Sequence, residues 1–201
     1  DIFLRTLSLV TVTLFFTSAG ASQGEIILAV NTLLMQLFTL FSYVMDGFAY
    51  AGEALSGRYI GARNRKAFTN TTRHLFIWGG WLAAFFTLVY ALGGNAFLGL
   101  LTDNKDVVSA AGTYFYWALA IPVAGISAFI LDGIFIGATA TRGMLASMAI
   151  AAISFFVVYY GLRPVLGNHA LWLAFLVYLA MRGVVQTLLS PKIIKENFTQ
   201  P

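Results

Sequence analysis

The fold is decided by one segment, Asp46-Gly-Phe-Ala-Tyr-Ala-Gly-Glu53-Ala-Leu-Ser-Gly-Arg58-Tyr-Ile-Gly-Ala-Arg-Asn-Arg-Lys66. It starts with carboxylates in an apolar run and ends in a strongly basic turn. A carboxylate inside a membrane helix is costly, so it indicates a charged partner, a water-filled cavity or a function. Basic residues gather on the cytoplasmic side of membrane proteins. The segment therefore predicts the inner end of a membrane-spanning helix, with Asp46 as its most informative residue.

The composition around this segment is that of an integral membrane protein. Hydrophobic residues make up 59% of the 201 positions, charged residues make up 10%, and the mean hydropathy is +0.81. Soluble domains carry about 25% charged residues. The chain has no Cys, which excludes disulfides and thiolate metal ligands.

Six apolar segments have the length of about 20 residues that a membrane-spanning helix needs. They cover roughly residues 2–19, 26–45, 74–92, 107–131, 144–161 and 170–189. The segment 2–19 also has features of a secretory signal peptide. The five further spans and the missing initiator Met favour a membrane-spanning helix instead. We predict an all-α integral membrane fold, with residues 1–201 forming a single six-helix bundle. The chain reads as one half of a longer protein.

The positive charges support this topology. If six spans alternate, ten of the 12 Lys and Arg residues lie on one side, and only Lys105 and Arg163 lie on the other. The ten are Arg5, Arg58, Arg63, Arg65, Lys66, Arg73, Arg142, Arg182, Lys192 and Lys195. This asymmetry predicts that both ends of the chain lie in the cytoplasm. We expect the protein in the inner (cytoplasmic) membrane. The asymmetry also accounts for the net charge of +4, so nucleic-acid binding is not needed to explain it.

A polar stripe runs along the second predicted helix. Its members recur at steps of three or four residues, which places them on one helix face: Asn31, Met35, Thr39, Ser42, Asp46, Tyr50 and Glu53. Two interpretations are open: hydrogen bonding between packed helices, or the wall of a cavity. The acidic Asp46 favours the cavity for substrate or cations. The candidate cavity residues are Asn31, Met35, Thr39, Ser42, Tyr43 and Asp46.

A second run, Asp132-Gly-Ile-Phe-Ile-Gly137-Ala-Thr-Ala-Thr-Arg142-Gly, resembles Asp46–Gly57 at an offset of 86 residues (132 − 46). Asp132 either caps the inner helix junction or takes part in proton uptake. Glu53 is expected to pair with Arg58 or Arg142 and close an inner gate. Pro122 removes a helical hydrogen bond, which predicts either a packing bend or a hinge.

Motifs of catalysis are missing from the sequence. There is no Gly-x-x-x-x-Gly-Lys-Ser/Thr phosphate loop, no His-Glu-x-x-His metal motif and no Gly-x-Ser-x-Gly elbow, and only 2 histidines. We therefore expect no enzyme activity, no cofactor and no bound metal. Carboxylates near inner helix ends, together with helix breaks, are typical of ion-gradient-driven transporters.

Three stretches carry a family resemblance. They are Asp46–Asn64, Leu131-Asp-Gly-Ile-Phe-Ile-Gly-Ala-Thr139 and Leu166-Gly-Asn-His-Ala-Leu-Trp-Leu-Ala174. Together they resemble the carboxyl-terminal lobe of a multidrug and toxin extrusion (MATE) transporter of the DinF-like branch, over nearly the whole chain.

The resemblance implies a twelve-helix antiporter, in which two six-helix lobes face a central cavity. Such proteins export organic, often cationic, compounds in exchange for protons or sodium. This chain would be the second lobe, and its partners would be the amino-terminal lobe, the lipid bilayer and small organic substrates. Sodium-coupled relatives carry a Glu on the first helix of this lobe, and residues 2–19 contain none. Protons are therefore expected over sodium.

Two other functions stay open. A flippase of lipid-linked or amphipathic substrates shares the two-lobe scheme, but it should have a more cationic cavity, and the polar stripe carries no Lys or Arg. The other alternative is a non-transporting membrane module.

Overall fold

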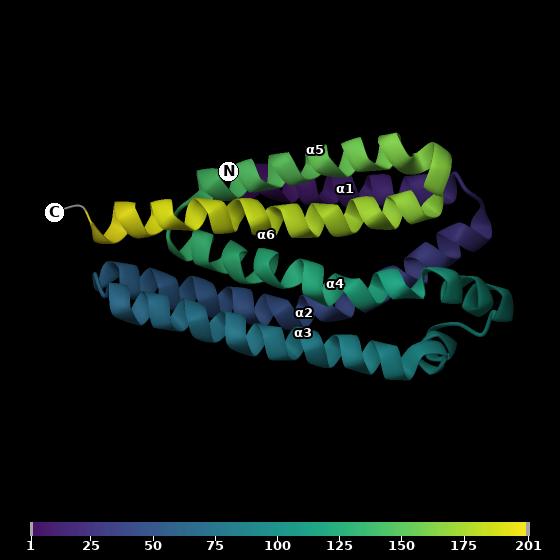
Figure 1. Cartoon of the computed structure of the whole chain (residues 1–201), viewed down its shortest axis with the longest axis horizontal. Helices are drawn as coiled ribbons and strands as arrows, with labels where there is room; N and C mark the ends of the chain where they lie inside the picture. Colours follow the sequence, from purple (N-terminus) through teal and green to yellow (C-terminus); the bar gives the residue numbers. More distant parts are fainter. Residues whose placement is uncertain (1, 200–201) are drawn as a thin grey trace.

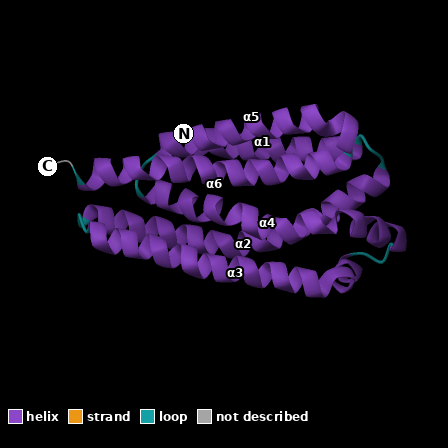
Figure 2. Ribbon diagram, viewed as in Figure 1, coloured by secondary structure: helices purple, strands orange, loops and turns teal. Residues whose placement is uncertain are grey.

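The computed structural model describes residues 2–199 as an all-helical bundle, with no strand in that range (Figure 2). All six helices are long and apolar enough to cross a membrane. They are α1 (Ile2–Ala21), α2 (Glu25–Gly61), α3 (Arg65–Leu101), α4 (Lys105–Gly137), α5 (Thr141–Leu166) and α6 (Asn168–Phe198). The predicted all-α membrane fold with six spans is confirmed.

The helices lie along one long axis, with α4 between two groups (Figure 1). Helices α1, α5 and α6 lie on one side of α4, and α2 and α3 lie on the other. The start of α1, the end of α6 and the α2–α3 and α4–α5 turns gather at one end of the bundle. We call this the inner end and the opposite one the outer end. The arrangement agrees with the even topology predicted from the charges.

Several helices are longer than the predicted spans. Helix α2 has 37 residues, about 55 Å at 1.5 Å per residue, which exceeds the thickness of a bilayer. Helix α3 also has 37 residues, but it bends at Gly94. The predicted spans 144–161 and 170–189 end too early, because α5 continues through Pro164 and α6 continues through Pro191. Proline keeps a helical φ, and neighbouring groups in a membrane bundle can satisfy the freed carbonyl.

Glycines break the helices where the prolines do not. Gly94 has φ 28° and ψ −117°, so α3 changes direction there and its last turns contain the short apolar stretch 97–101. Gly167 has φ 55° and separates α5 from α6. A positive φ is strained for residues with a Cβ atom, which explains glycine at both breaks.

The two similar runs noted in the sequence pack against each other along α2 and α4. A Cβ atom at Gly133 would collide with the carbonyl oxygen of Ala49, and one at Gly137 would collide with that of Glu53. Both runs point toward the inner end, so Asp46 and Asp132 lie on neighbouring parallel helices. Small residues let membrane helices approach at backbone contact, and α2 and α4 are the most extensively packed pair of helices in the bundle.

The first helix, α1, is anchored at its outer half. Phe15 packs against Phe155, Phe156 and Tyr159, with ring centroids 4.9–5.8 Å apart. Phe16 is buried and packs edge-on against Trp172 at 4.9 Å. Toward the inner end, residues 3–11 include no buried side chain. The inner half of α1 therefore lies on the bundle surface.

Candidate functional site

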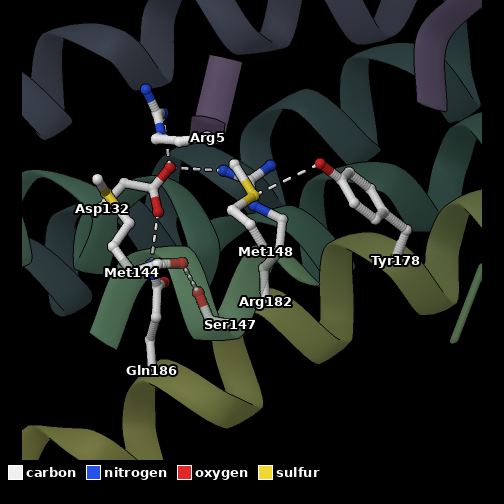
Figure 3. Close-up of polar contacts among 8 residues, drawn as sticks. All are labelled: Arg5, Asp132, Met144, Ser147, Met148, Tyr178, Arg182 and Gln186. Atoms are coloured by element: carbon white, nitrogen blue, oxygen red, sulfur yellow. Dashed lines mark hydrogen bonds and ion pairs between the residues drawn. The ribbon is translucent and has the colours of Figure 1, made fainter. Parts of the chain in front are cut away.

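Asp132 lies at the centre of a buried polar cluster that joins three helices (Figure 3). Its Oδ2 accepts a hydrogen bond from Arg182 Nη2 at 2.5 Å and one from Arg5 Nη2 at 2.8 Å. Its Oδ1 accepts one from Gln186 Nε2 at 2.5 Å. Asp132 is only 2% exposed, so α4 supplies a buried anion that α1 and α6 neutralise. We call Arg5, Asp132, Arg182 and Gln186 the Asp132 cluster.

Helix α6 presents its part of the cluster at a spacing of four residues. Tyr178, Arg182 and Gln186 occupy successive turns and therefore share one face. The Arg182 guanidinium lies 5.6 Å from the ring of Tyr178 and 6.0 Å from the ring of Phe129. The hydroxyl of Tyr178 in turn donates to Met148 Sδ at 3.5 Å (Figure 3). These contacts hold Arg182 in one position.

The position of Arg182 corrects the charge count made from the sequence. Arg182 was expected on the cytoplasmic surface, but its residue is 2% exposed and lies 16 positions before the end of α6 (198 − 182). That distance is about 24 Å along a helix. Asp132 makes this depth tolerable, because a buried charge needs a partner of opposite sign. The spacing of Arg182 and Gln186 on one face was the signal available in the sequence.

The Asp132 cluster is not balanced by itself. Two guanidinium groups face one carboxylate, which leaves one positive charge in excess. Three of its atoms are buried without a hydrogen-bond partner: Arg5 Nε, Arg182 Nε and Gln186 Oε1. A buried donor without an acceptor is costly. The cluster therefore has the capacity to bind one more negative group.

Asp46 is the acidic residue placed to supply that charge. It is partly exposed on α2, and it lies within electrostatic range of Arg5, Asp132 and Arg182. With Asp46 ionised, the four charged groups sum to zero. The structure thus brings Asp46 and Asp132 into one electrostatic system.

Asn31 occupies a different environment from the rest of the predicted cavity stripe. It is 2% exposed, and its Oδ1 accepts from Asn168 Nδ2 at 2.8 Å and from Trp172 Nε1 at 2.9 Å. Its Nδ2 donates to Asn168 Oδ1 at 2.8 Å. This arrangement matches the other interpretation of the stripe, hydrogen bonding between packed helices, and it fastens α2 to α6.

The remaining candidate cavity residues lie on a more open face of α2. Met35, Thr39 and Ser42 are partly exposed, and the two hydroxyls donate to carbonyl oxygens of their own helix at 2.8–2.9 Å. Tyr43 is 72% exposed, and Tyr50, two turns further along the helix, is 70% exposed. Asp46 therefore lies beside a surface with two accessible phenol rings.

Glu53, the first of the predicted gate residues, lies seven positions after Asp46 and therefore on the same face of α2. Glu53 is partly buried, and in the part of the chain that the structure describes no ion pair joins it to Arg58 or Arg142. The main chain of Glu53 instead contacts Gly137, where α2 and α4 approach closely. Pro122 is buried inside α4, which continues through it. A gate role for these residues and a hinge at Pro122 stay predictions.

Comparison with known proteins gives the family. The MatE family model matches residues 2–165. DNA damage-inducible protein F of Escherichia coli (strain K12) is 44% identical over 184 residues, which cover 92% of this chain and 40% of that protein. Protein DETOXIFICATION 42 of Arabidopsis thaliana is 24% identical over 188 residues, or 91% of this chain and 36% of its own length. The chain thus spans about 40% of the relatives it matches, and it belongs to the MatE family of multi-pass membrane proteins.

Proposed function

We propose that this chain is the second lobe of a secondary antiporter that exports organic, often cationic, compounds across the cytoplasmic membrane in exchange for protons. The observation that carries the proposal is Asp46, a partly exposed carboxylate on an open face of α2, next to a buried ion cluster. The name DETOXIFICATION of one relative supports an export role. Transport, rather than an enzymatic reaction, is the proposed activity.

The face around Asp46 has the chemistry to bind an organic cation. Tyr43 and Tyr50 expose their rings on either side of it along the helix. Aromatic faces attract cations, and a partly desolvated carboxylate adds a charge partner. Met35 supplies a flexible apolar side chain that can adapt to ligands of different shape. The amino-terminal lobe would complete the cavity from the opposite side.

The coupling ion follows from which carboxylate is free. Both oxygens of Asp132 are occupied by hydrogen-bond donors, and its charge is paired with two arginines. Within residues 2–199, no hydrogen-bond donor is found on Asp46, which is partly exposed. A single accessible carboxylate can exchange a proton for an organic cation, because the two compete for one charge. Protons are accordingly proposed over sodium.

The orientation and the gate are part of the same proposal. The basic α2–α3 turn supports an orientation with the inner end of the bundle in the cytoplasm. Glu53, Arg58 and Arg142 surround that end, where they would close the cavity in a state in which α2 and α4 are shifted relative to each other. Pro122 would then serve as the bend of α4.

The test uses the full-length protein in vesicles with an imposed proton gradient. Export of a fluorescent organic cation should fall at least about tenfold in Asp46→Asn, with normal membrane insertion. Asp103→Asn is the matched control, because Asp103 is exposed in the outer α3–α4 loop. Wild-type export by Asp46→Asn would mean that Asp46 is structural. Movement of a labelled lipid without cation export would favour the flippase alternative.

A further inference from the structure

We propose that Arg5 is an internal competitor for the substrate: its guanidinium alternates between Asp132 and Asp46, and an organic cation or a proton at Asp46 returns it to Asp132. This inference rests on the proposed function and adds a residue that determines how tightly cations bind. It also links occupancy of the cavity to the position of α1.

The first observation is the unsatisfied donor of Arg5. Its Nη2 is bound to Asp132 at 2.8 Å, while its Nε is buried without an acceptor. Asp132 already accepts from Arg182 and Gln186, so it cannot satisfy all the donors that converge on it. An ionised carboxylate offers about four acceptor positions and suits the fork of a guanidinium. Asp46 lies one turn before Ala49, whose main chain packs against Gly133 beside Asp132, so it is a nearby carboxylate with such positions to offer.

The second observation is the difference between the two arginines. The Arg182 side chain is 2% exposed and held between aromatic rings, whereas the Arg5 side chain is 27% exposed. Arg5 also projects from the inner half of α1, where residues 3–11 include no buried side chain. The aromatic anchor at Phe15 and Phe16 holds only the outer half. Arg5 can therefore move toward Asp46 while Arg182 stays on Asp132.

The third observation is the set of charges that act on Asp46. They come from α1 (Arg5), α4 (Asp132) and α6 (Arg182), with Tyr178 of α6 beside the last two. Helix α3 also packs against α2, and among the described residues it adds no charge to this set. When Asp46 is ionised and empty, Arg5 faces two carboxylates. When Asp46 carries a proton or binds a cation, only Asp132 attracts Arg5.

This exchange makes Arg5 a positioning residue with two effects. It occupies the carboxylate that an organic cation needs, so the cation must displace it. Its return to Asp132 draws the inner half of α1 onto α4, at the end of the bundle that faces the cytoplasm in the proposed orientation. Binding at Asp46 would thus favour the position of α1 in which Arg5 is bound to Asp132. Coupling between two sites requires such a difference in binding between two conformations.

The first experiment measures binding of tetraphenylphosphonium, a permanent cation, to the purified full-length protein. Removing the competitor in Arg5→Gln should tighten binding about tenfold, while turnover in vesicles falls because α1 no longer responds. Arg5→Lys should retain wild-type affinity. Arg163→Gln is the matched control, because Arg163 is exposed at the outer end. In an Asp46→Asn background, Arg5→Gln should leave the affinity unchanged. Unchanged affinity in Arg5→Gln, or equal effects in both backgrounds, would overturn the proposal.

The second experiment does not depend on transport. Spin labels are attached to the full-length protein, with any cysteine outside this chain replaced, at Leu7→Cys on α1 and Ile150→Cys on α5, two exposed positions. Lowering the pH from about 8 to about 4 reaches the ordinary pKa range of carboxyl groups, so Asp46 gains a proton in a large fraction of molecules, and this should shift the distance in the wild-type background. The distance should not respond to pH in Asp46→Asn or Arg5→Gln. A distance change with pH that persists in both variants would assign the movement to other titratable groups and overturn the proposal. This result does not depend on whether the protein exports cations.

Discussion

Arg182 of α6 and Asp132 of α4 form an ion pair at 2.5 Å in which each residue is only 2% exposed. Membrane helices gain little from burying apolar side chains against each other, since lipid tails are equally apolar. A buried ion pair with additional donors instead specifies which helices meet and in which register. In this bundle it aligns α4 with α6, and Arg5 extends the alignment to α1.

Loss of the anion should therefore be severe. Asp132→Asn leaves Arg182 buried without a counter-charge, and we expect a loss of about 3–5 kcal/mol in folding free energy. Thermal unfolding of the full-length protein in detergent measures it, with Asp103→Asn as the control. A melting temperature equal to that of the control would show that Arg182 finds another partner.

Asn31 is predicted to act in structure more than in substrate binding. Asn31→Leu removes its contacts to Asn168 and Trp172, and it should cost about 1–2 kcal/mol, a typical range for hydrogen bonds between membrane helices. Cation affinity of the surviving folded protein should be unchanged. The neighbouring Thr32→Ala, at an exposed position, provides the reference for both measurements. A loss of cation affinity without a loss of stability would indicate that Asn31 lines the substrate cavity.

The contact between α2 and α4 should not tolerate a methyl group. Gly133→Ala places a Cβ atom against the carbonyl oxygen of Ala49, so the helices must separate and disturb Asp132 next to it. We expect a loss of at least about 2 kcal/mol, in the range of overpacked cores. Gly47→Ala is the matched control, because its Cβ atom would have no neighbour within 4 Å. Similar expression and melting of the two variants would contradict the backbone contact.

A smaller effect is expected at the outer end. Trp117 Nε1 and the Tyr116 hydroxyl both lie at hydrogen-bond distance from His169 Nδ1, at 3.0 and 2.9 Å, and so connect α4 to α6. Trp117→Phe removes one donor at a partly exposed place, which should cost about 1 kcal/mol without changing export. Melting curves and export assays on the same preparation test both parts. A change in export at unchanged stability would point to a role in the transport cycle.

The local sequence pattern was enough to predict the membrane fold and some residues of the candidate site. The six apolar segments, the basic turn 62–66 and the helical spacing of the polar stripe depend only on neighbours in the chain, so they could be read directly. The same holds for Asp46, since a carboxylate in an apolar run is unusual wherever the helix packs. Local rules failed at Pro164 and Pro191, because surrounding helices allow a membrane helix to continue through proline.

Which partner each polar group meets was decided by tertiary structure alone. Arg182 and Asp132 are 50 positions apart, and Arg5 and Asp132 are 127 apart. The spacing shows that Arg182 and Gln186 share a helix face, but it does not identify the carboxylate that they meet. Likewise, Asn31 shares its helix spacing with Asp46, but only the packing of α6 turns it inward toward Asn168. Periodicity determines the face of a helix, and the contact between helices determines whether that face meets a partner or remains open.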